Sequence, residues 1–133
     1  MDEFAYADGF GLAGPQLRAI RYLERTTVAT DSMFLWGWDG AIPYLVDRVS
    51  PSRFTFAGPL MWGSHSETRQ GYRAELMQAL RAHPPQVMVR GTMSDALLKP
   101  DEAWPFEDLE AYLRSAYRRD TVVAGYEILR RRR

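Results

Sequence analysis

The sequence predicts a single α/β domain built as a compact, three-layer Rossmann-like or flavodoxin-like sandwich. Two observations lead to this prediction. Segments with helical apolar spacing alternate along the chain with short apolar runs of strand length, and this alternation is typical of a sheet covered by helices on both faces. The last two apolar runs follow each other directly, which indicates a mixed sheet with an antiparallel C-terminal edge.

Four helices are expected, three from an apolar stripe and one from its place after a strand. They span residues 15–25, 40–49, 69–81 and 106–117. Pro15 suits the first turn of the first helix, because the N–H that proline lacks would have no partner there. Tyr72, Leu76 and Leu80 form the stripe of the third helix, which the double proline at 84–85 ends.

Short apolar runs predict the strands. They lie at residues 32–36, 53–56 and 86–89, with a closing pair at 121–124 and 126–129. The run Arg53-Phe54-Thr55-Phe56 is assigned from its strict polar–apolar alternation. Gly125 separates the last two runs, which form either a strand pair or one interrupted strand. We expect one domain over residues 15–133 after an irregular lead-in over residues 1–14.

The composition excludes several classes of function. The chain has 133 residues and no cysteine, so a disulfide scaffold, a Cys-based zinc site and a cysteine nucleophile are ruled out. The 17 basic and 17 acidic residues balance, and we expect no nucleic-acid partner. No run reaches the roughly 18 to 20 apolar residues of a membrane helix, so the isolated chain is expected to be soluble. Neither phosphate-binding glycine motif is present, and His65 and His83 lack metal-ligand spacing, so we expect no cofactor and no metal site.

The segment Trp36-Gly37-Trp38-Asp39-Gly40 is the first candidate for a functional site. It follows the first expected strand, and ligands in open α/β sheets collect beyond the carboxyl ends of strands. The tryptophans either stack on a ligand such as a sugar ring or pack in the core. Asp39 is either a functional carboxylate or a turn and helix-cap residue.

Arginine supplies the other candidates. Arg48 and Arg53 flank a Ser-Pro-Ser turn and either converge on a phosphate, or on Asp39 and Asp47, or lie on a solvated face. The four arginines at positions 130–133 either hold an acidic partner or anionic lipid head groups, or form a frayed tail.

Several of these residues resemble the soluble C-terminal region of a known enzyme family. The matching residues are Leu35-Trp36-Gly37-Trp38, Tyr44-Leu45, Arg48 and Pro51-Ser52-Arg53-Phe54, followed by Pro84-Pro85, Trp104-Pro105-Phe106 and Gly125-Tyr126-Glu127-Ile128. The family is that of bacterial membrane glycosyltransferases of the family-39, protein-mannosyltransferase-like, GT-C type. The resemblance covers residues 16–131. Asp47 departs from the small residue that these domains often carry, and residues 62–68 lie outside the pattern.

The resemblance implies a role rather than a reaction. Members of the family take a sugar from a polyprenyl-phosphate carrier at the outer face of the membrane, with catalytic carboxylates in a membrane-embedded region that this chain does not contain. It implies a non-catalytic accessory domain on the extracytoplasmic, periplasmic face of the bacterial cell membrane, which shapes the acceptor or donor cleft or braces the membrane region. The chain would then not be an enzyme on its own.

Two further expectations follow from the resemblance. The partner would be the membrane-embedded catalytic region of the same polypeptide, with a glycan or a lipid-phosphate head group as a further ligand. The surface that meets them is assigned to five side chains: Trp38, Asp39, Tyr44, Arg48 and Arg53. The alternative is a stand-alone small Rossmann-like domain that binds a ligand or another protein.

Overall fold

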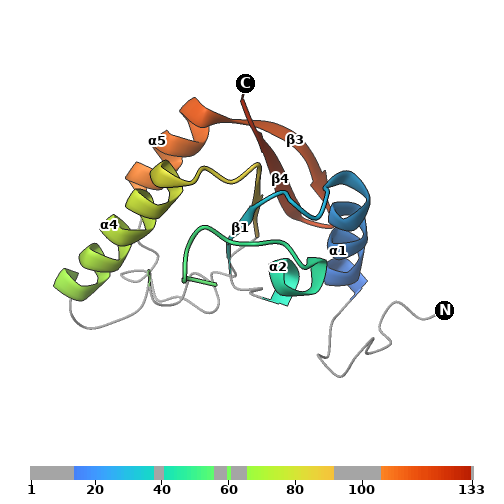
Figure 1. Ribbon diagram of the computed structural model, residues 1–133, viewed down its shortest axis with the longest axis horizontal. Coiled ribbons are helices and arrows are strands. Elements are labelled where there is room, and N and C mark those ends of the chain that lie inside the picture. The colour runs from blue at the N-terminus through green and yellow to red at the C-terminus, as the bar shows by residue number, and fades with distance from the viewer. Residues whose placement is uncertain (1–13, 38–40, 56–59, 61–65, 92–105, 133) are drawn as a thin grey trace.

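The computed structural model describes residues 14–37, 41–55, 60, 66–91 and 106–132. Within these ranges the chain is a mixed α/β protein (Figure 1). The elements are α1 (Gly14–Thr26), β1 (Met33–Trp36), α2 (Ala41–Val46), α4 (Ser66–Ala82), β2 (Val87–Arg90), α5 (Glu107–Ala116), β3 (Tyr117–Val123) and β4 (Tyr126–Arg131). The predicted helices and the predicted first and third strands are confirmed, with boundaries that differ by a few residues.

The described strands form one four-stranded sheet in the order β1-β2-β4-β3. β1 and β2 are parallel, whereas β4 is antiparallel to both β2 and β3. A parallel pair needs a crossover connection, and the chain between β1 and β2 contains α2 and α4. The predicted antiparallel C-terminal edge is confirmed, and Gly125 separates two paired strands.

The turn of this C-terminal hairpin has two residues with positive φ. The φ angles are 52° at Ala124 and 90° at Gly125. Two consecutive left-handed residues suit a two-residue hairpin, because their twist matches the right-handed twist of the paired strands. Glycine adopts this conformation without strain, whereas alanine does not.

Each face of the sheet has its own apolar core. Along β1, Phe34 and Trp36 pack with α4 and α5, whereas Met33 and Leu35 pack with α1 and α2. This division follows from the alternation of side chains along a strand. Figure 1 shows the same arrangement, with α4 and α5 on one side of the strands and α1 and α2 on the other.

The prediction of a strand at residues 53–56 is wrong over its described part, residues 53–55. The free edge of β1 is met earlier in the chain, where the Met33 amide donates to the Val49 carbonyl at 2.9 Å and Ser32 and Val49 form an isolated bridge. Phe54 is only 5 % exposed and lies between two exposed side chains. The polar–apolar alternation at residues 53–55 therefore arises because a loop buries the single ring of Phe54.

Candidate functional site

A small pocket lies beside the carboxyl end of β1. It has a volume of about 180 Å³ and is lined by Leu35, Pro43, Tyr44, Arg48, Ser50, Phe54 and Thr55. We call it the α2 pocket. Of the five predicted site residues, Tyr44 and Arg48 line it, and Tyr44 is 72 % exposed. Trp38 and Asp39 lie outside the described residues.

The Arg48 side chain makes four hydrogen bonds to residues at or near the ends of two helices. Its Nε donates to Thr27 Oγ1 at 3.0 Å and its Nη2 to the Thr27 carbonyl at 3.2 Å. Its Nη1 donates to the carbonyls of Val46 at 2.8 Å and Asp47 at 3.2 Å. Because Thr27 follows α1 and Val46 ends α2, the guanidinium group joins the ends of two helices. This side chain therefore forms one wall of the α2 pocket in a fixed position.

Arg53 is directed to a different element. Its guanidinium group forms a two-pronged ion pair with Glu75 on α4, with Nε–Oε2 and Nη2–Oε1 distances of 2.6 and 3.0 Å. It also lies 4.7 Å from the ring centre of Phe54 and 5.5 Å from that of Tyr72. The hydrogen bond from Arg53 lowers the pKa of the Glu75 carboxyl. Arg48 and Arg53 thus have separate partners.

Arg73 on α4 is a second arginine held close to the core. Its Nε donates to the Leu60 carbonyl at 2.9 Å, and its Cζ lies 4.6 Å from the ring centre of Phe106. Burial, with a smaller contribution from the charge of Arg69, lowers its pKa to about 10. The helical spacing of the sequence gives no sign that the charge of Arg73 is partly buried.

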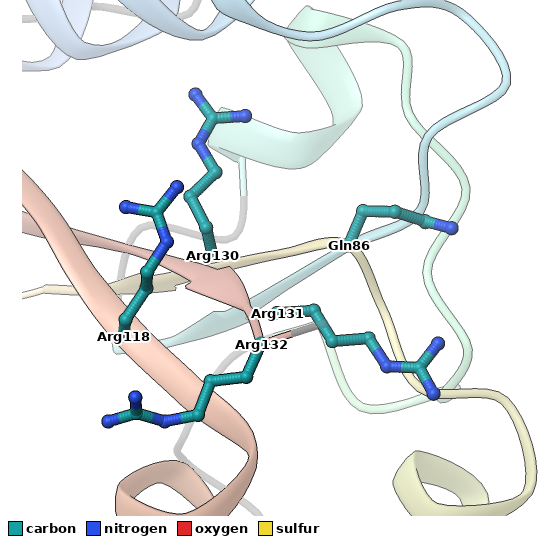
Figure 2. A pocket seen from close by; sticks show the side chains of 5 residues that line it. All are labelled: Gln86, Arg118, Arg130, Arg131 and Arg132. Atoms are coloured by element: carbon teal, nitrogen blue, oxygen red, sulfur yellow. The ribbon is translucent and has the colours of Figure 1, made fainter.

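A larger pocket lies at the opposite end of the strands, where β1 and β2 begin and β4 ends. It has a volume of about 450 Å³ and is lined by Gln86, Arg118, Arg130, Arg131 and Arg132. We call it the basic pocket. Figure 2 shows Arg118 and Arg130 extending to the same side, while Arg131 and Arg132 extend in opposite directions. The pocket is therefore an open basic surface.

The sequence drew attention to the C-terminal arginines but not to Gln86 or Arg118. Strand pairing brings these residues together, since Arg130 is the partner of Val87 on one side and of Arg118 on the other. Gln86 is oriented by Ser32, whose amide and hydroxyl both donate to its Oε1, at 2.8 and 2.7 Å. No local sequence motif predicts that these residues lie together.

The described ranges contain no group of three or more His, Asp or Glu side chains that could hold a metal ion. None of the helices within those ranges combines the length and the apolar character needed to cross a membrane. Comparisons with known protein families, with curated protein sequences and with solved structures find no match to this chain.

Proposed function

We propose that this chain is the soluble accessory domain of a bacterial membrane glycosyltransferase of the family-39, GT-C type, with a Rossmann-like three-layer fold. One observation carries the proposal. Leu35, Tyr44, Arg48 and Phe54 all belong to the run that resembles the family, and all four line the α2 pocket. Residues that are up to 19 positions apart in the chain would then serve one surface.

The α2 pocket has the character of a contact surface. Tyr44 lines the pocket and is 72 % exposed, and Val49, five residues later but outside the pocket lining, is 71 % exposed. Tyrosine is enriched at contacts between proteins and at the membrane–water interface, because its ring is apolar and its hydroxyl is polar. In the proposed arrangement the pocket faces the membrane-embedded catalytic region of the same polypeptide, on the extracytoplasmic side. Sugar transfer from the polyprenyl-phosphate carrier takes place in that region, and this domain braces it or shapes its cleft.

The decisive experiment is to find the mass and the cellular fraction of the native protein. An antibody raised against the 133-residue chain is used to probe the membrane and soluble fractions of the source cells. We expect a band much heavier than 15.3 kDa in the membrane fraction only. A band near 15.3 kDa in the soluble fraction, with none in the membrane, would overturn the proposal.

The surface is tested next in the heavier protein. A photo-crosslinking amino acid replaces Tyr44, and the matched control carries it at Val122, which is 48 % exposed on β3. Cross-linked peptides between position 44 and the membrane-embedded region are expected, with none from position 122. Equal yields from both positions would show that the α2 pocket is not the contact surface.

The same exposed side chains favour an alternative, a stand-alone domain that binds another protein. Ligand pockets for drug-sized molecules have volumes of roughly 300 to 1,000 Å³. The α2 pocket, at about 180 Å³, is small for a nucleotide and better suited to one protruding side chain of a partner. Dimerisation that rises with concentration in light scattering, and that Tyr44→Ser abolishes, would favour this alternative.

A further inference from the structure

The basic pocket concentrates positive charge at one end of the sheet. Four of its five lining residues are arginines. Within the described ranges, Asp120 is the only acidic residue that forms an ion pair with these arginines, and it pairs with Arg118 and Arg130. Four guanidinium groups against one carboxylate leave a formal excess of three positive charges. The chain as a whole is neutral, so this excess is a local feature.

The pairing of Arg118 with Arg130 is unfavourable without a counter-charge. The two residues are direct cross-strand partners on β3 and β4, and like charges in that position destabilise a sheet. Asp120 offsets part of this repulsion, with Oδ2 3.3 Å from Arg130 Nε and Oδ1 3.9 Å from Arg118 Nη1. Tyr22 also donates to Asp120 Oδ2, at 3.1 Å, which divides its hydrogen-bonding capacity further. One carboxylate therefore serves two guanidinium groups and a phenol.

The arginines differ in how far the fold uses them. Arg130 is 20 % exposed and also donates to the Thr26 carbonyl at 3.1 Å, so its charge is engaged in the structure. Arg118 is 58 % exposed, and the long contact to Asp120 is its only ion pair with another residue in the part of the chain that the structure describes. Neither Arg131 nor Arg132 makes a side-chain hydrogen bond or ion pair with any other residue in the described ranges, and both are exposed. Three guanidinium groups are thus available to a ligand.

Part of this positive charge lies near helix ends. The Arg130 guanidinium group donates to the Thr26 carbonyl at the end of α1, and the backbone amide of Arg132 donates to the Ala116 carbonyl at the end of α5. Cations near helix C-termini are favoured by the helix dipole, which carries about half an elementary charge. Half-charges at two helix ends amount to about one charge, so they do not cancel the excess of three.

We propose that the basic pocket binds the phosphate groups of a multivalent anion. Arginine suits this chemistry because its planar fork donates two parallel hydrogen bonds to a phosphate. Arg131 and Arg132 extend in opposite directions in Figure 2, so a single enclosed phosphate would not reach both, whereas an anion with several phosphate groups would. The phosphates are presented either by a soluble polyphosphorylated compound or by the head groups of a lipid surface. Phosphate binding here does not depend on the glycosyltransferase proposal.

The test uses the 133-residue chain and two probes. Sodium tripolyphosphate is titrated into the isotope-labelled protein at about 0.15 M salt and followed by NMR amide shifts. Sedimentation with vesicles of phosphatidylglycerol, and with control vesicles of phosphatidylcholine, forms the second arm. The variant is Arg132→Glu and its control is Arg21→Glu, an exposed position on α1 that carries the same change of charge. Circular dichroism checks that both variants are folded.

The expected shifts cluster at residues 86, 118 and 130–132. Loss of a charge-assisted hydrogen bond and its replacement by a like charge should weaken tripolyphosphate binding by about tenfold or more in Arg132→Glu. The control should change it less than about twofold, because Arg21 does not line the basic pocket and salt screens the interactions of an exposed charge. If the protein sediments with phosphatidylglycerol vesicles and Arg132→Glu abolishes this, the phosphates belong to a lipid surface. If the protein binds tripolyphosphate but not the vesicles, the phosphates belong to a soluble ligand. Absence of both, or equal weakening in the two variants, overturns the proposal.

Discussion

Replacing Arg48 with alanine should destabilise the fold, because this side chain ties the end of α1 to the end of α2. Four hydrogen bonds join its guanidinium group to Thr27, Val46 and Asp47. Removing it leaves the Thr27 and Val46 carbonyls without these donors. Thr27 is 7 % exposed, so water reaches it poorly.

The size of the effect follows from the two shorter contacts. A hydrogen bond to a charged group contributes about 1.5 to 3 kcal/mol, and contributions that share one side chain are not additive. The contacts at 2.8 and 3.0 Å therefore set the scale, and the two at 3.2 Å add little. Arg48 is only half-buried, which admits some water to the site. We expect Arg48→Ala to lower the free energy of unfolding by about 2 to 3 kcal/mol.

Urea unfolding followed by circular dichroism measures this difference. Arg21→Ala on the exposed face of α1 is the control, with an expected change within about 0.5 kcal/mol. Thr27→Val keeps the volume but removes the hydroxyl that accepts from Arg48, so a double-mutant cycle should give a coupling of about 1 kcal/mol. A loss below about 0.5 kcal/mol for Arg48→Ala would refute the structural role and return Arg48 to the group of ligand-binding candidates.

Four further substitutions test other parts of the fold by urea unfolding. Tyr117→Phe should cost about 1 to 2 kcal/mol at pH 8, because its buried hydroxyl donates to the Pro85 carbonyl. Burial, with Tyr112, raises the pKa of Tyr117 in the folded state, so an unfolded tyrosine loses its proton first. The wild-type advantage over this variant should then shrink as the pH rises above about 10, and a difference that stays constant to pH 11 would contradict the burial. Gly37→Ala should cost about 1 to 3 kcal/mol, since its Cβ would lie 3.2 Å from Gly91 Cα, whereas Gly71→Ala on α4, with no atom within 4 Å, should stabilise by about 0.5 to 1 kcal/mol. Ala124→Asn should stabilise by about 0.5 to 1 kcal/mol, because asparagine tolerates the left-handed conformation at this turn, and a loss would show that the turn is not of this type.

The parts of the fold that the sequence predicts are those decided by local periodicity. The stripe of Leu76 and Leu80 on α4 and the double proline before β2 predict a helix and its end without knowledge of any contact. Gly125 marks a break between the last two apolar runs, but whether it joins two paired strands or interrupts one depends on strand pairing, which the sequence leaves open. At residues 53–55 local periodicity was misleading, because a strand also needs a neighbour for its backbone groups and Val49 already meets the free edge of β1.

The basic pocket shows why a site built by strand register is harder to predict. Counting back from the turn at Ala124 and Gly125 would place Arg119 opposite Arg130. The register shifts between Arg119 and Thr121, so that Arg118 is opposite Arg130 instead. One extra residue in a strand turns the following side chains to the other face. Arg119 is paired with Glu127 at 3.0 Å, and Arg118 lines the pocket.

The number of hydrogen bonds that each side chain makes within the protein offers a physical criterion for sorting the arginines into structural and ligand-binding groups. Arg48 makes four hydrogen bonds with groups of its own chain, so its loss should appear in the free energy of unfolding. Arg132 is exposed and its side chain makes no hydrogen bond or ion pair within the described ranges, so its loss should leave stability within about 0.5 kcal/mol and appear in phosphate binding. The free energy of unfolding and the tripolyphosphate affinity are measured for Arg48→Ala and Arg132→Glu. We expect Arg48→Ala to change the first quantity and Arg132→Glu to change the second. If Arg132→Glu were the more destabilising change, or if Arg48→Ala were the one that weakened tripolyphosphate binding, the criterion would fail and the roles of the two arginines would have to be exchanged.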